Sequence, residues 1–249
     1  MLGQGTYGQV WKVNQNRCRK QLTIDHPDER RRHFEEYHTL CRLVHPNIVP
    51  VLGYDSGQSG GLPSFEMPML GLDVGKLIQI QRGQCPLLDT RQLGDLQSAI
   101  MLLVEMKLVH LDIKPENVLI HGTKLVLCDF GLSAKEGEII YREEKITPGY
   151  WPPEFMGDKL RACTSLDVFA LGVVALEMVL RRRLYAEFKA CAGSVICMQL
   201  VRDRLLREVA DADMRGAIAA MLEIDVRQRH MNLVTRRRHS AAICSAGAQ

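Results

Sequence analysis

The chain has 249 residues, of which 46% are hydrophobic and 24% are charged. This balance is that of an ordinary globular protein, and the length allows a buried core without disulfide staples. The formal charge of +3 is too small to predict a nucleic-acid partner. The eight cysteines form no Cys-x-x-Cys pair, so they do not indicate a zinc site. We expect them to be reduced thiols in an intracellular protein.

No targeting or membrane segment is evident in the sequence. The longest apolar stretch, residues 168–180, contains Glu177 and predicts a buried helix rather than a membrane span. No secretory signal follows Met1, and we therefore expect a cytoplasmic protein. Because the chain opens directly inside a glycine-rich motif, we also expect it to be a piece of a longer protein.

The first part of the chain, to about residue 69, predicts short strands and one helix. Residues 9–13 and 17–24 have the composition of paired strands around an asparagine-rich turn. Residues 28–43 predict a helix, and residues 47–54 a further strand. The apolar positions that recur at helical spacing in the predicted helix are Phe34, Tyr37, Cys41 and Val44.

The chain is predicted to be mainly helical from Gly71 onward. Two short strands, at 118–120 and 125–128, precede an irregular segment at 129–154. A small strand-rich part followed by a large helical part predicts an α+β fold in two lobes, with a ligand cleft between them. The predicted helices cover residues 93–108, 166–180, 194–209 and 214–222.

A glycine-rich motif opens the sequence, with Gly3, Gly5 and Gly8 followed by Val10. Glycines let backbone amides approach phosphate oxygens without a side chain in the way. A dinucleotide-binding fingerprint needs a strand before the glycines and a helix after them. Here strand-like residues follow, which favours a loop between two antiparallel strands. Without other motifs, a flexible terminal turn would be the better explanation of the glycines.

A second motif is far more specific. It runs His110-Leu111-Asp112-Ile113-Lys114-Pro115-Glu116-Asn117-Val118-Leu119. A carboxylate such as Asp112 can orient an acceptor hydroxyl and take its proton, and Lys114 can offset charge on a transferring phosphoryl group. The amide oxygen of Asn117 suits a hard cation such as Mg²⁺. The motif resembles the catalytic loop of eukaryotic protein kinases of the serine/threonine type.

The resemblance continues through the following segment. Asp129, in Cys128-Asp129-Phe130-Gly131, resembles the kinase aspartate that binds Mg²⁺, and Asn117 would be the second metal ligand. Thr147 precedes a stretch with Pro-Pro-Glu in place of the usual Ala-Pro-Glu. The resemblance implies that its Glu154 pairs with Arg229. It also implies that Asp167 braces the backbone of the catalytic loop, and a helix N-terminal carboxylate is the alternative explanation.

Kinases hold the nucleotide phosphates with a lysine and a helix glutamate, and the resemblance places these at Lys20 and Glu36. Because the stretch between Val10 and Lys20 is shorter than usual in the family, Lys12 and Glu35 remain the alternatives. Strand parity nevertheless allows Val10, Cys18 and Lys20 to face one cleft. The adenine hinge is predicted around Met67. The predicted nucleotide-binding residues are Leu2, Gly3, Gly5, Gly8, Val10, Cys18, Lys20, Pro68, Leu70 and Leu119.

The resemblance implies a serine/threonine kinase that uses ATP and Mg²⁺ on protein substrates. A pseudokinase that binds or scaffolds without transfer is the alternative, and tyrosine specificity is a lesser one. Leu111 stands where many kinases have an arginine that binds a phosphorylated activation loop. We therefore expect activity that does not depend on such phosphorylation. The kinase domain is predicted at residues 1–232, with lobes at 1–69 and 70–232. Residues 233–249 are expected to be a disordered basic tail.

Overall fold

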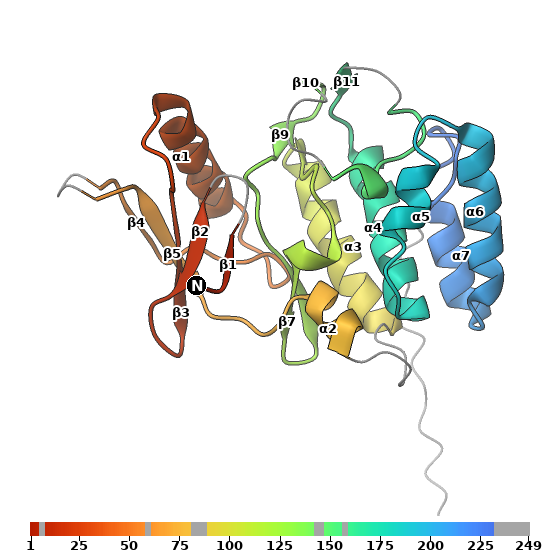
Figure 1. The fold of residues 1–249 in the computed structure, drawn as a ribbon, viewed down its shortest axis with the longest axis horizontal. Helices are drawn as coiled ribbons and strands as arrows, with labels where there is room; N and C mark the ends of the chain where they lie inside the picture. The colour runs from red at the N-terminus through yellow and green to blue at the C-terminus, as the bar shows by residue number, and fades with distance from the viewer. Residues whose placement is uncertain (5–7, 58–60, 81–88, 142–146, 156–158, 232–249) are drawn as a thin grey trace, which may run out of the picture.

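The computed structural model describes residues 1–4, 8–57, 61–80, 89–141, 147–155 and 159–231. These residues form two parts, which Figure 1 shows side by side. The part at the left, the N-lobe, is a sheet with one helix. The part at the right, the C-lobe, is mainly helical. This arrangement confirms the predicted two-lobed α+β architecture.

The N-lobe sheet is antiparallel and has five strands in the order β1-β2-β3-β5-β4. Gly3 pairs with Val10 across the first two strands, so the glycine motif joins two antiparallel strands as predicted. Val10 in turn lies opposite Lys20. The strands are β1 (Gly3–Gln4), β2 (Gln9–Lys12), β3 (Arg17–Gln21), β4 (Gly53–Asp55) and β5 (Ser64–Pro68).

The N-lobe helix α1 (Pro27–Arg42) begins with a proline, whose fixed φ suits the first helical turn. Its buried residues are His33, Glu36 and Leu40. The predicted apolar stripe was therefore on the wrong face, because its members Phe34, Cys41 and Val44 are exposed. The helix instead turns a polar residue, Glu36, toward the interior. Hydrophobic periodicity cannot identify such a face.

The predicted strand at 47–54 is wrong for residues 47–52, because the strand observed there, β4, begins only at Gly53. Ile48 forms an isolated bridge with Leu127 of the C-lobe, and the side chain of Asn47 donates a hydrogen bond to the carbonyl of Leu125. This segment therefore pairs with a C-lobe strand instead of extending the N-lobe sheet. Pro50, which has no N–H to donate, also prevents a longer ladder.

The C-lobe is organised around α4 (Thr164–Leu180), whose residues from Leu166 to Met178 are all buried. A single hydrophobic cluster runs from this helix into the N-lobe. No helix among the described residues is long and apolar enough to cross a membrane. The other C-lobe helices are α2 (Val74–Ile80), α3 (Thr90–Glu105), α5 (Tyr185–Ala190), α6 (Val195–Glu208) and α7 (Ala212–Met221).

The segment predicted as irregular, 129–154, contains regular structure. Strand β9 (Ala134–Lys135) pairs with β6 (Leu108–Val109), and β10 (Ile139–Tyr141) pairs with β11 (Lys159–Arg161). These strands are too short to show a clear sequence period. A hairpin of β7 (Val118–His121) and β8 (Lys124–Leu127) precedes the segment, as predicted.

The expectation of reduced thiols is wrong for two cysteines. Cys191, just after α5, and Cys197, in the first turn of α6, form a disulfide. They are separated by six positions and not by the spacing of a metal-binding pair. Cys18, Cys41, Cys128 and Cys163 are free thiols.

Candidate active site

A cleft of about 1010 Å³ is lined by residues of both lobes. Of the predicted nucleotide-binding residues, Gly8 does not line the cleft, and Gly5 lies outside the described residues. Gly8 is needed for a different reason, since a Cβ there would lie 2.7 Å from the carbonyl oxygen of Gln21. The predicted residues that do line the cleft are Leu2, Gly3, Val10, Cys18, Lys20, Pro68, Leu70 and Leu119.

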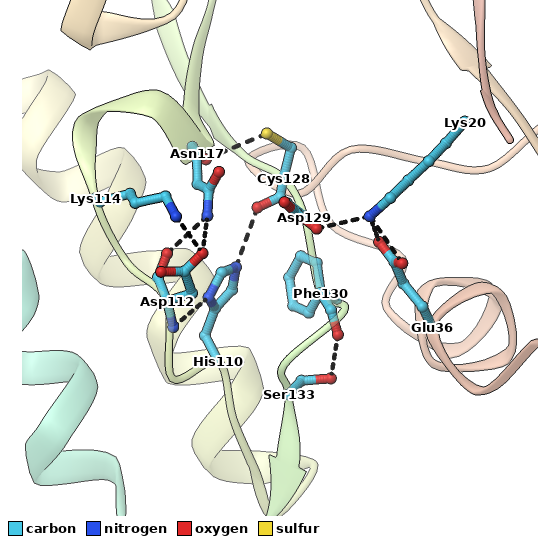
Figure 2. Close-up of polar contacts among 10 residues, drawn as sticks. All are labelled: Lys20, Glu36, His110, Asp112, Lys114, Asn117, Cys128, Asp129, Phe130 and Ser133. Carbon is cyan, nitrogen blue, oxygen red and sulfur yellow. Dashed lines mark hydrogen bonds and ion pairs between the residues drawn. The ribbon is translucent and has the colours of Figure 1, made fainter. Parts of the chain in front are cut away.

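The amine of Lys20 lies between two carboxylates at the back of the cleft (Figure 2). It donates to both oxygens of Glu36, at 2.7 and 2.8 Å, and to Oδ1 of Asp129 at 2.7 Å. Both Lys20 and Glu36 are buried, whereas the side chain of Asp129 is 34% exposed. The structure thus brings together three predicted residues that come from β3, α1 and the turn after β8.

The charges of Lys20, Glu36 and Asp129 shift one another's pKa values. Burial alone would lower the pKa of Lys20, but the Asp129 and Glu36 carboxylates raise it above its usual value. Burial also acts to raise the pKa of Asp129, and the nearby Lys20 charge reverses that effect and lowers it. For Glu36, burial raises the pKa and Lys20 opposes the rise. A charged lysine is therefore held at the point where phosphate oxygens would enter.

The alternatives for this pair lie elsewhere. Lys12 is exposed at the end of β2 and does not line the cleft. Glu35 pairs with Arg31 on the exposed side of α1, at 2.8 Å. The geometry therefore favours Lys20 and Glu36 as the phosphate-binding pair.

Asp112 is the centre of a second polar cluster. Its partners Lys114, Asn117 and Thr147 line the cleft, whereas Asp112 itself does not. Its Oδ2 accepts from the Lys114 amine at 2.6 Å and from the Asn117 amide at 2.8 Å. Its Oδ1 accepts from the Thr147 hydroxyl at 2.9 Å. The carboxylate is buried, and its lone pairs are directed by three neighbours. Thr147 therefore contacts the catalytic loop directly.

The catalytic loop is held in place from behind by Asp167. Its two carboxylate oxygens accept the backbone N–H groups of His110 at 2.6 Å and Leu111 at 2.9 Å. These contacts agree with the predicted bracing role, and Asp167 also lies in the first turn of α4, where a carboxylate meets the helix dipole. Leu111 needs this support because its φ is +68°, a conformation that is costly for a residue with a side chain.

His110 connects this loop to the segment that carries Asp129. Its Nδ1 accepts from the N–H of Asp112 at 3.2 Å, so its Nε2 carries the proton and donates to the Cys128 carbonyl at 3.1 Å. The ring packs edge-on against Phe130 with the centroids 4.6 Å apart. Asp129, between these two contacts, has a φ of +64°. The strained backbone turns its carboxylate toward Lys20.

The predicted pair of Glu154 and Arg229 is confirmed. The guanidinium of Arg229 binds Glu154 with both terminal nitrogens, and the Nη2–Oε2 distance is 2.9 Å. Arg229 also donates to the Glu223 carbonyl at 2.8 Å. Its side chain is fully buried, so the pair anchors the segment after Thr147 to the C-lobe core.

The comparison with known families agrees with this geometry. The model described as "Protein kinase domain" matches residues 1–232. The chain belongs to the protein kinase family. The predicted membership of the eukaryotic protein kinases is therefore confirmed, and phosphoryl transfer is the chemistry of the family.

Two curated relatives are receptor kinases of Arabidopsis thaliana. The kinase is 33% identical over 200 residues to L-type lectin-domain containing receptor kinase V.5. The matched region is 74% of this chain and 30% of that protein. It is 29% identical over 268 residues to L-type lectin-domain containing receptor kinase V.7. Here the matched region is 98% of this chain and 40% of that protein. The kinase thus spans well under half the length of these relatives.

The oxygen atoms of Asn117 and Asp129 at the cleft are of the kind that binds the Mg²⁺ of a magnesium nucleotide. The amide nitrogen of Asn117 is directed at Asp112, which leaves its Oδ1 pointing toward Asp129 (Figure 2). In the described part of the kinase, no group of three or more His, Cys, Asp or Glu could hold a metal ion by itself. Mg²⁺ is commonly held by one or two protein oxygens together with phosphates, and Asn117 and Asp129 could supply such oxygens.

Leu111 contributes to packing and carries no charge. It belongs to a small apolar cluster with Ile140 of β10 and Leu166 of α4. The segment between Asp129 and Thr147 is therefore tied to the catalytic loop by apolar contacts at the place where an arginine could bind a phosphate.

Some cleft residues were missed by sequence reasoning. Glu116 lies inside the catalytic-loop motif but was assigned no role, and Arg183 was not singled out, although both line the cleft. For Glu116, its place inside the motif was the available signal.

Proposed function

We propose that this protein is an active serine/threonine kinase that transfers the γ-phosphate of MgATP to protein hydroxyls. The observation that carries the proposal is the buried Asp112 carboxylate, which is bonded by Lys114, Asn117 and Thr147. These three partners line the same cleft as Lys20 and Asp129. All charged positions that the chemistry needs are occupied by residues of the required type.

The catalytic-loop residues have separate roles in the proposed reaction. The acceptor hydroxyl donates a hydrogen bond to an Asp112 oxygen, which orients the hydroxyl oxygen and takes up its proton. The amine of Lys114, which bonds Asp112 Oδ2, offsets negative charge beside the acceptor. When bound, MgATP supplies the phosphoryl group and the divalent cation. Lys20 would bind its phosphates, and Asn117 and Asp129 would hold the cation.

Two features support serine or threonine as the acceptor. Lys114 and Thr147 both contact Asp112 and each other, with a Lys114 Nζ–Thr147 Oγ1 distance of 3.3 Å. They narrow the space beside the carboxylate, which favours a short aliphatic hydroxyl over a tyrosine ring. The match to the serine/threonine type of catalytic loop points the same way.

The test is phosphate transfer from MgATP to a generic basic protein, with the wild type and the Asp112→Asn variant compared. We expect transfer to fall by about 10²- to 10⁴-fold in the variant, the range attributed to general acid–base catalysis. Mass spectrometry of the product should find phosphoserine or phosphothreonine. Equal signals from both proteins would exclude the proposal and favour a binding or scaffolding role. A cytoplasmic location remains a separate prediction.

A further inference from the structure

At the end of the cleft near α2, Arg183 of the kinase binds the acidic side chains of Glu116 and Glu177. Arg183 follows α4 and reaches back toward the catalytic loop. Its Nη1 lies 2.5 Å from Oε1 of Glu116, and its Nη2 lies 2.7 Å from the hydroxyl of Tyr150. Glu116 is two residues from Lys114, so this contact adjoins the proposed acceptor site. Arg183, Glu116, Lys114 and Thr147 all line the same cleft.

A buried carboxylate lies behind this contact. Glu177 is fully buried in α4 and lies 3.4 Å from Nε of Arg183. It also accepts from the Tyr150 hydroxyl at 3.0 Å and from the N–H of Leu184 at 2.6 Å. A buried carboxylate is costly without a cation, and Arg183 provides one. The arginine is therefore held by three polar partners and is only 28% exposed.

Helix α2 packs closely against the same cluster. A Cβ at Gly75 would lie 3.2 Å from Nη1 of Arg183, 3.1 Å from Oδ1 of Asp73 and 3.4 Å from Cδ of Glu116. Asp73 is itself paired with the amine of Lys76 at 3.0 Å. The two carboxylates that line this end of the cleft, Asp73 and Glu116, thus already contact a cation of the kinase, and so does the buried Glu177 behind them.

We propose that Arg183 determines substrate specificity by occupying the position that an arginine or lysine of a protein substrate would otherwise take. A planar guanidinium fits a pair of carboxylates better than an ammonium does. Here Arg183 supplies that guanidinium to Glu116 and Glu177. The kinase therefore does not select basic residues around its acceptor hydroxyl. This inference rests on the proposed function for its biological meaning, but the charge arrangement can be tested by binding alone.

The experiment uses fluorescent Gly/Ala peptides with one central serine, and the same peptides with arginine placed in turn at each flanking position. Anisotropy gives the ratio of Kd values for each pair, and kcat/KM gives the matching ratio for phosphate transfer. The wild-type protein should bind the arginine and alanine peptides within about threefold of each other. In Arg183→Ala, the arginine peptide should gain about tenfold or more at one or two positions, as expected for a hydrogen bond to a charged group.

Arg182→Ala is the matched control, because Arg182 is the adjacent residue and pairs with Glu187 and Glu208 away from the cleft. It should leave the ratios at the wild-type value. A tenfold preference of the wild type for arginine at any position would overturn the proposal. So would an equal gain in Arg182→Ala, or no gain in a folded Arg183→Ala protein.

A second variant covers the case in which removal of Arg183 prevents folding. Glu116 is largely exposed, and Glu116→Gln removes its charge without leaving a buried ion. Because the Glu116 carboxylate is already paired with Arg183, the ratio of Kd values for the arginine and alanine peptides should not change. A tenfold loss of arginine binding would show that Glu116 serves the substrate and would refute the inference. If binding follows the prediction but no phosphate is transferred, the proposed activity fails and the specificity inference stands.

Discussion

The amine of Lys20 lies 2.7 Å from Oδ1 of Asp129, although 109 positions separate the two residues in the chain. One residue belongs to the N-lobe sheet and the other to the C-lobe. Their contact joins the two lobes at the back of the cleft, and Glu36 fixes the lysine from the opposite side. This geometry makes the effect of single substitutions in α1 predictable.

Glu36→Gln should lower kcat/KM for ATP by about 10- to 100-fold, because a lysine with one ionic partner no longer keeps its position. Steady-state kinetics at varied ATP concentration measures the effect. Glu35→Gln is the control on the same helix, where the exposed pair with Arg31 is lost, and it should stay within about twofold of the wild type. Equal losses in both variants would contradict the assignment.

The double variant Ser133→Ala, Tyr141→Phe should keep activity within about threefold of the wild type. Leu111 packs in an apolar cluster with Ile140, so this segment needs no phosphate to bind the catalytic loop. The Ser133 hydroxyl donates to the Phe130 carbonyl at 2.8 Å, and its loss should cost only about 1 kcal/mol of stability.

Thr147 is left intact in that variant because its hydroxyl bonds Asp112 directly. Phosphatase treatment of the wild-type protein, followed by the same activity assay, provides the control. A folded double variant without activity would show that phosphorylation of this segment is required.

Arg229→Ala should lower the free energy of unfolding by about 3 kcal/mol, because it removes a fully buried guanidinium and leaves the partly exposed Glu154 carboxylate without its cation. Chemical denaturation measures this change. The exposed Arg227, which pairs with Asp225 at 3.0 Å, provides the control. Arg227→Ala should change stability by less than about 1 kcal/mol. Similar losses in the two variants would mean that the Glu154–Arg229 pair does not anchor the segment.

His33 should make stability fall in acid. Its ring is 1% exposed, packs on Phe65 with centroids 4.8 Å apart, and neither ring nitrogen has a hydrogen-bond partner among the described residues. Burial, with a smaller contribution from the charge of Lys20, lowers the pKa of His33 to about 4. The unfolded chain, with a pKa near about 6.5, binds a proton in the window between these values and the folded protein does not.

Stability is therefore complete above the unfolded pKa and falls as the pH drops toward the folded pKa, by about 3 kcal/mol at most. Urea unfolding at pH 7 and near pH 4.5 should show a smaller pH effect in His33→Leu than in the wild type. His38→Leu, at an exposed position of the same helix, should keep the wild-type dependence. An unchanged dependence in His33→Leu would rule out this source of acid sensitivity.

Local signals in the sequence were enough for the architecture and for the order of the motifs. The glycine loop between antiparallel strands, the bracing aspartate Asp167 and the Arg229–Glu154 pair all agree with the structure. The glycine loop followed from the residues themselves, whereas the other two were implied by the resemblance to protein kinases. Periodicity failed on α1, where packing buries Glu36 and His33 and leaves Phe34 exposed.

The sequence by itself thus determined which residue types are available for phosphoryl transfer and the order in which they follow one another. Only the tertiary structure showed that Lys20 and Glu36 form a buried pair in the cleft while Lys12 and Glu35 lie outside it. Only the tertiary structure likewise placed Arg183 against Glu116. The physical reason is that ion pairs of this kind join residues many positions apart. Their formation depends on how helices and strands pack, which no local pattern of residues records.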